Sequence, residues 1–191
     1  MKLLQLNLAK SLSRYQTLVT WAINNSYDIL VLQEIPNSSA ILHNLMGARI
    51  YLPASEGVPL VAIIVLNSSI PVQHVFIHDS PWYIEIEVPV NGQLIGIASF
   101  YNQIQAGEGP LDCLKERLLF NANQLMVLMD ANASHRSWCF ITNREVNIFR
   151  NIFDRFRLHI LNVPWSITRR AMVDDQEGSV IDLSVISADS N

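Results

Sequence analysis

The chain has 191 residues, of which 50% are hydrophobic and 16% charged, a composition that excludes intrinsic disorder. This length suits one domain with a sizeable core, which we expect to span residues 1–191. No apolar run approaches the ~20 residues that cross a bilayer, and the N-terminus is too polar for a signal peptide, so we expect no membrane contact. The formal net charge of −4 gives no global attraction to nucleic acid.

Cysteine usage and local charge add two expectations. Cys113 and Cys139 have no metal-binding or redox spacing, which indicates free thiols in a reducing, intracellular compartment. Between Arg136 and Arg170 lie seven arginines and only two acids, so this stretch carries about +5 on an acidic protein. Such a stretch is compatible with a polyanionic partner, and equally with a solvated helix face.

Hydrophobic periodicity predicts alternating strands and helices along the chain. Apolar residues at i, i+3, i+4 and i+7 predict helices, and continuous apolar runs predict strands buried on both faces. In chain order we expect strand 3–6, helix 13–25, strands 28–33, 61–66, 82–88 and 94–100, a helix from residue 110, strand 125–129, helix 144–157, and strands 159–163 and 180–186. These elements predict an α/β domain with mixed sheets covered by helices.

Strand 82–88 has a different pattern from the fully apolar strands. Its apolar residues alternate with Tyr83, Glu85 and Glu87, which predicts a half-buried strand. Asn91-Gly92 follows it and predicts a hairpin turn into strand 94–100.

Polar side chains stand where four of the predicted strands end: Asn7, Glu34, Tyr101 and Asp130. A fifth, Asp182, interrupts an apolar strand, where a carboxylate needs an ion partner, a hydrogen bond or a metal. Function concentrates at such positions because a rigid strand fixes the side chain while substrate can reach it. Any one of these residues could equally cap a loop, so the hypothesis of a functional site depends on the set.

Several motifs extend this set along the chain. They are Leu4-Gln5-Leu6-Asn7, Asp28-Ile29-Leu30-Val31-Leu32-Gln33-Glu34, Ala98-Ser99-Phe100-Tyr101, Met129-Asp130-Ala131-Asn132-Ala133-Ser134-His135 with Trp138, Leu158-His159-Ile160-Leu161-Asn162, Ile167-Thr168-Arg169, and Ser179-Val180-Ile181-Asp182-Leu183. In content and order they resemble the endonuclease/exonuclease/phosphatase superfamily, most closely the apurinic-type endonuclease domain of non-LTR retrotransposons. The resemblance implies that superfamily's four-layered fold, a two-sheet β-sandwich flanked by helices, here without its C-terminal strand.

The resemblance also implies a role for each motif residue. Glu34 would be the ligand of one Mg²⁺, with Mn²⁺ as an alternative cation. The catalytic set would be Asn7, Tyr101, Asp130, Asn132 and Asp182. Asp130 would orient or deprotonate the attacking water, and Asn132 would hold phosphate or water. Asn7 and Tyr101 would donate hydrogen bonds to phosphoryl oxygens as charge develops there. Thr168 and His135 would contact substrate, although Thr168 could equally be a turn hydroxyl and His135 a surface-loop residue.

The chain departs from the family pattern at its end. These families end in Ser-Asp-His, whose His contacts phosphate, but nine residues follow Asp182 and none is His. Met129 and Ala131 replace the usual Gly and Phe around the Asp. We therefore expect either a fragment or incomplete gene model, or a decayed element, with impaired catalysis. We also expect the last core strand, 180–186, to lack a partner and leave an exposed edge.

Three functions remain open. The first is a Mg²⁺-dependent endonuclease that nicks double-stranded DNA, nuclear in location, with a reverse-transcriptase domain on the same polyprotein as a partner. The second is a phosphatase or nuclease of another branch of the superfamily. The third is an inactive remnant that folds and binds nucleic acid weakly.

Overall fold

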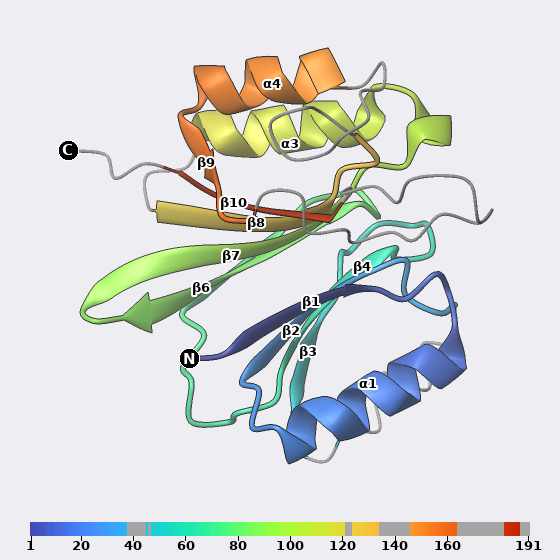
Figure 1. Cartoon of the computed structure of the whole chain (residues 1–191), viewed down its shortest axis with the longest axis vertical. Helices are drawn as coiled ribbons and strands as arrows, with labels where there is room; N and C mark the ends of the chain where they lie inside the picture. Colours follow the sequence, from blue (N-terminus) through green and yellow to red (C-terminus); the bar gives the residue numbers. More distant parts are fainter. Residues whose placement is uncertain (38–44, 46, 121–123, 134–145, 164–181, 188–191) are drawn as a thin grey trace.

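The computed structural model of the chain describes residues 1–37, 45, 47–120, 124–133, 146–163 and 182–187 (Figure 1). Two β-sheets lie face to face, with helix α1 on the outer side of one and helices α3 and α4 on the outer side of the other (Figure 1). The expected four-layered sandwich is therefore confirmed. No helix in these ranges is long and apolar enough to traverse a bilayer.

The first sheet contains β1 (Leu3–Asn7), β2 (Ile29–Gln33), β3 (Arg49–Tyr51) and β4 (Val61–Val65), in the order β1-β2-β4-β3. Strands β1 and β2 are parallel because α1 (Leu12–Asn24) crosses between them. Ser11 caps α1, accepting a hydrogen bond from the backbone N–H of Arg14. The buried face of α1 packs on Leu30, Leu32, Ala62 and Ile64 and consists of Tyr15, Leu18, Val19 and Ala22.

The second sheet has the strand order β5-β6-β7-β8-β10-β9. Its strands are β5 (His74–Ile77), β6 (Tyr83–Val90), β7 (Gln93–Tyr101), β8 (Gln124–Asp130), β9 (Leu158–Ile160) and β10 (Asp182–Ser187). The short helix η1 (Ile104–Ala106) and α3 (Gly109–Phe120) connect β7 to β8, and α4 (Val146–Arg155) precedes β9. Asn91 and Gly92 both have positive φ, 51° and 84°, as expected for the β6–β7 hairpin turn.

Apolar side chains fill the space between the sheets and the space under the helices. Ile29, Val31 and Ile63 meet Ile84, Ile97 and Leu128 in the interior of the sandwich. A second cluster joins the outer face of the β7–β8 region to α3 and α4 through Phe100, Leu114, Phe149 and Phe153. The sandwich therefore supports both sheets rigidly up to the ends of their strands.

Most of the predicted strands and helices are confirmed within one to three residues; two short strands were missed and two expectations need correction. The short strands β3 and β5 were not predicted, since few residues define their pattern. Strand β6 is buried on both faces, with Glu85 0% and Glu87 3% exposed. The last strand, β10, has a partner on each side, β8 and β9, so it leaves no edge.

The second face of β6 is covered through α3. Arg117 on α3 donates from Nε and Nη2 to the two carboxylate oxygens of Glu85, at 2.7 and 2.8 Å. Tyr83 donates its hydroxyl to the same carboxylate, and the Arg117 guanidinium lies 3.9 Å from the centre of the Phe76 ring. These contacts compensate the cost of burying a carboxylate, so an alternating sequence is compatible here with two buried faces.

Candidate active site

The polar strand ends predicted from the sequence meet at one end of the sandwich. Asn7 and Glu34 come from the ends of the parallel strands β1 and β2 in the first sheet. In the second sheet, Asp130 at the end of β8 lies opposite Tyr101 of β7 on one side and Asp182 of β10 on the other. The site is therefore formed by both sheets, and their separation determines its geometry.

The Asn7 side chain joins the two halves of the site. Its Nδ2 donates to Glu34 Oε1 at 2.9 Å and also to Asp130 Oδ2. Its Oδ1 accepts from the backbone N–H of Ala9 at 2.8 Å, which fixes the orientation of the amide. Because one nitrogen contacts both carboxylates, the two groups lie close together. One hydrated Mg²⁺ can link two carboxylates to a common phosphate only if they lie within roughly ten ångströms of each other, and these two satisfy that condition.

The loop after β8 places Asn132 beside the same carboxylate. Its backbone N–H donates to Asp130 Oδ1 at 3.1 Å, and its side chain donates to the carbonyl of Asn102 at 2.9 Å. Asn102 in turn donates its side-chain amide to the carbonyl of Ala131 at 2.8 Å. Asn102 is 2% exposed and links the loops after β7 and β8, a role that we did not predict. Its position directly after Tyr101 was the only signal in the sequence.

Two site residues hold unusual backbone conformations. Glu34 has φ 46° and Asn132 has φ 48°, and both are L-residues in the left-handed region. The carbonyl of Glu34 accepts from the backbone N–H of Lys10 at 2.7 Å, which supports this turn. Such conformations cost of order 1–3 kcal/mol each and cluster at functional sites, where the surrounding structure holds them.

Burial and like charge change the electrostatics of the site. Burial, and after it the neighbouring carboxylate of Asp182, raise the pKa of Asp130 to about 7. Burial, with the nearby carboxylates of Glu34 and Asp130, raises the pKa of the Tyr101 hydroxyl far above its ordinary value. Tyr101 therefore keeps its proton at neutral pH and can act as a hydrogen-bond donor.

The donor set fits a hard divalent cation. The polar side chains at the site are carboxylates, amides and the Tyr101 hydroxyl, all of which offer oxygen to Mg²⁺ and no sulfur to a soft metal. Among the described residues, no Lys or Arg forms an ion pair with Glu34 or Asp130. No group of three His, Cys, Asp or Glu in these ranges could enclose a metal, but Mg²⁺ keeps several waters and needs only one or two carboxylates.

Three residues of the predicted motifs fall in other parts of the chain. Thr168, His135 and Trp138 lie outside the described residues. The described histidines do not join the site: His74 is on β5, His78 contacts Glu116 on α3, and His159 is on β9.

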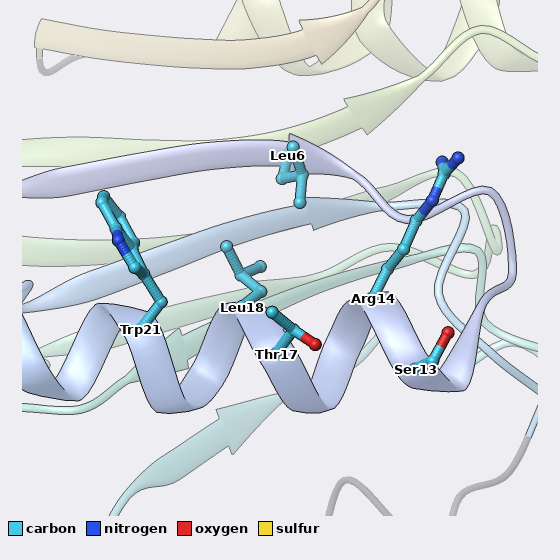
Figure 2. A pocket seen from close by; sticks show the side chains of 6 residues that line it. All are labelled: Leu6, Ser13, Arg14, Thr17, Leu18 and Trp21. Carbon is cyan, nitrogen blue, oxygen red and sulfur yellow. The ribbon is translucent and has the colours of Figure 1, made fainter.

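A groove of about 380 Å³ lies away from these carboxylates, between β1 and α1. Figure 2 shows Leu6 of β1 facing Leu18 and Trp21 of α1 across it. Its lining is mainly apolar, with Arg14 at one end, so it offers no group for acid–base or metal chemistry.

The geometry can be compared with known proteins. No protein-family model and no curated protein sequence matches the chain. The solved endonuclease domain of TRAS1, a telomere-specific non-LTR retrotransposon, superposes with a TM-score of 0.76 at 18% identity, covering 97% of this chain and 84% of that one. An endonuclease/exonuclease/phosphatase family protein from Leptotrichia buccalis superposes with a TM-score of 0.68 at 16% identity, covering 97% and 87%.

The chain has the endonuclease/exonuclease/phosphatase fold. A third structure with this fold, D. rerio TDP2 complexed with a single-strand DNA product, superposes with a TM-score of 0.62 at 13% identity, covering 98% and 83%. Identities this low show the fold alone. The resemblance predicted from the motifs is confirmed, and function must be argued from the site.

Proposed function

We propose that this chain is a Mg²⁺-dependent phosphodiester hydrolase that nicks double-stranded DNA. The observation that carries the proposal is the Asn7 amide, hydrogen-bonded at once to Glu34 from one sheet and Asp130 from the other. This contact brings the candidate metal ligand, Glu34, and the candidate general base, Asp130, together where the strands of the two sheets end. The similarity to the TRAS1 endonuclease domain supports DNA as the substrate.

Each group has a distinct task in this proposal. Glu34, at the exposed side of the pair, would hold the cation, and a bound Mg²⁺ would supply positive charge to the phosphate. Asp130, 1% exposed and held by Asn7 and Asn132, would orient the attacking water and take its proton. Its raised pKa brings it close to neutral pH, where a general base is most effective.

The neutral donors would act on the phosphoryl oxygens. Asn7 has two amide hydrogens, and Tyr101 keeps its hydroxyl proton because its pKa is raised. Tyr101 would donate to an oxygen that gains negative charge in the transition state, and Asn7, whose two hydrogens are bound to Glu34 and Asp130, would do so once a cation takes the Glu34 carboxylate. Asn132 would hold the phosphate or the water from the other side, and Asp182 keeps Asp130 in a field that favours proton uptake.

DNA contact would come from basic residues and from the loops around the site. Arg150, Arg155 and Arg157 lie on or just after α4, on the outer layer of the second sheet, while the other four arginines of 136–170 lie outside the described residues. We include Thr168 and His135 as substrate contacts, a reverse-transcriptase domain as a partner, and a nuclear location in the proposal. Contacts between these arginines and DNA phosphates would position the DNA without reading its sequence.

A supercoiled-plasmid assay tests the proposal. The protein should convert supercoiled plasmid to nicked circles with Mg²⁺ or Mn²⁺ and not with EDTA, and Asp130→Asn should lower the rate ~10²-fold or more. Glu56→Gln, a carboxylate-to-amide change on an exposed loop, is the control and should leave the rate unchanged. Release of phosphate from a monoester without nicking would instead indicate a phosphatase. Salt-sensitive DNA binding without either reaction would indicate the inactive remnant.

A further inference from the structure

Two glutamines cross the apolar interior of the sandwich just behind the active site. Gln33 of β2 is 0% exposed, and its Nε2 donates to the carbonyl of Leu128 on β8 at 3.1 Å. Gln5 of β1 donates from Nε2 to the carbonyl of Met129 at 2.9 Å. The two amides thus bind consecutive carbonyls of β8, which immediately precede Asp130.

Two hydroxyl groups complete this arrangement. Ser99 of β7 accepts from Gln33 Nε2 at 3.0 Å and donates to the carbonyl of Leu32 at 2.9 Å, so it returns a bond to the first sheet. Ser184 of β10 donates to Gln5 Oε1 at 3.2 Å. These four residues, the inter-sheet bridge, tie β1 and β2 to β7, β8 and β10, the strands that carry the site.

We infer that the inter-sheet bridge of Gln5, Gln33, Ser99 and Ser184 positions the active site by setting how the strand ends of one sheet meet those of the other. Gln33 is the residue before Glu34, and Gln5 lies two residues before Asn7 on the same side of its strand. Apart from the hydrogen bonds of the site residues themselves, the packing contacts between these strands come from apolar side chains such as Ile29, Val31 and Leu128, and they carry no direction. A shift of β8 along β2 would separate Asp130 from Asn7 while leaving that apolar packing largely intact. This inference deepens the proposed function and rests on it for its relevance to catalysis.

A matched pair of variants tests the bridge. Gln33→Met keeps the length of the side chain and removes the amide, so an apolar interior should accept it. Tyr83→Phe is the control, because it removes a buried hydrogen bond inside one sheet and none between the sheets. Both proteins should remain folded by circular dichroism. The double variant Gln5→Met/Gln33→Met should show the larger effect.

The first measurement does not depend on activity. The side-chain amide of Asn7, assigned by ¹H–¹⁵N NMR in the metal-free protein, should change its chemical shift in Gln33→Met and not in Tyr83→Phe. Mg²⁺ affinity by calorimetric titration should fall about tenfold in Gln33→Met and be unchanged in the control. In an active protein kcat should fall with little change in KM, since positioning acts on the reacting groups.

An Asn7 signal in Gln33→Met and in the double variant that matches the wild-type signal would overturn the inference. So would equal losses of Mg²⁺ affinity in Gln33→Met and Tyr83→Phe, because the bridge would then act only through stability. A wild-type protein without any nicking would contradict the proposed function, but the Asn7 signal would still decide whether the bridge positions the site.

Discussion

Asp130 illustrates how a buried carboxylate links the site to stability. Its pKa is raised to about 7 in the folded protein, by burial and by Asp182, against 3.8 for the free side chain. The folded state therefore binds a proton more tightly than the unfolded state. The stability that this proton contributes is fully present below about pH 4 and is lost as pH rises through about 7.

This shift gives a prediction for the metal-free protein. Between pH 4 and 8, wild type should lose up to roughly 4 kcal/mol of unfolding free energy relative to Asp130→Asn, which cannot titrate. Urea unfolding of both proteins at several pH values measures the difference. Parallel pH profiles would show that Asp130 titrates normally in the folded state.

Glu34 gives the second prediction at this scale. Glu34→Gln keeps the side-chain shape and the contact with Asn7 but removes the negative charge, so Mg²⁺ affinity should fall at least tenfold. The melting temperature without metal should change little, because no Lys or Arg among the described residues pairs with Glu34. Calorimetric titration with Mg²⁺ checks this, with Glu56→Gln as the control. Equal affinity in Glu34→Gln and wild type would remove Glu34 from the metal site.

Residues at strand ends could be predicted from the sequence, whereas residues that act through them could not. Asn7, Glu34 and Asp130 each end an apolar run, so the pattern marks them. Asn102 follows Tyr101 in a loop, where asparagine is common for other reasons. A polar residue inside an apolar strand needs a partner, and that reasoning, which identified Asp182, applies equally to Gln5 and Gln33. Their partners are carbonyls of β8 in the second sheet, more than ninety residues away in sequence, so only the structure identifies them.

Among the elements, β6 and α3 show where periodicity misleads. Alternating Glu85 and Glu87 indicate a solvated face, but a sequence cannot reveal that a helix from residues 109–120 returns to cover it. The decisive contact is Arg117 on Glu85, two residues far apart in sequence. Elements defined by local patterns were therefore predicted well, and burial that depends on distant pairing was not.

This contact predicts a large and local effect on stability. Arg117→Met leaves the fully buried Glu85 carboxylate without its cation, which should cost about 3 kcal/mol or more. Lys115→Met on the same helix removes an exposed pair with Asp112 and should cost less than about 0.5 kcal/mol. Urea denaturation measures both. Similar small losses in the two variants would mean that the ion pair of Arg117 with Glu85 contributes little to stability.

Strand β1 gives the second prediction at this scale. In the described part of the chain it pairs only with β2, and Leu3–Asn7 contains no Pro or charge to protect its other edge. Leu6, 38% exposed, lies at the groove beside α1 (Figure 2). We expect concentration-dependent self-association that Leu6→Lys reduces and that Thr20→Lys, an equal change on the exposed face of α1, does not. Sedimentation velocity over a dilution series measures this, and a wild-type monomer at high concentration would contradict it.

The whole molecule joins two sheets so that their strand ends share one site. The layers follow from the alternation of apolar strands and amphipathic helices, which is why the fold could be predicted. The distance between the sheets could not be predicted, because it depends on side chains that pack across the interior, including the inter-sheet bridge.

DNA binding is also a property of the whole molecule. Binding through phosphates should weaken steeply between 50 and 200 mM salt, and salt-insensitive binding would contradict a phosphate-based interface.

The central claim is that Glu34 and Asp130 act together on one phosphodiester. The most direct test compares the plasmid-nicking rates of wild type, Glu34→Gln, Asp130→Asn and the double variant under saturating Mg²⁺. We expect each single variant to lose ~10²-fold or more, and the double variant to lose little beyond the worse of the two, as groups that act as a unit do. Wild-type nicking in either single variant, or losses that multiply in the double variant, would contradict a shared site.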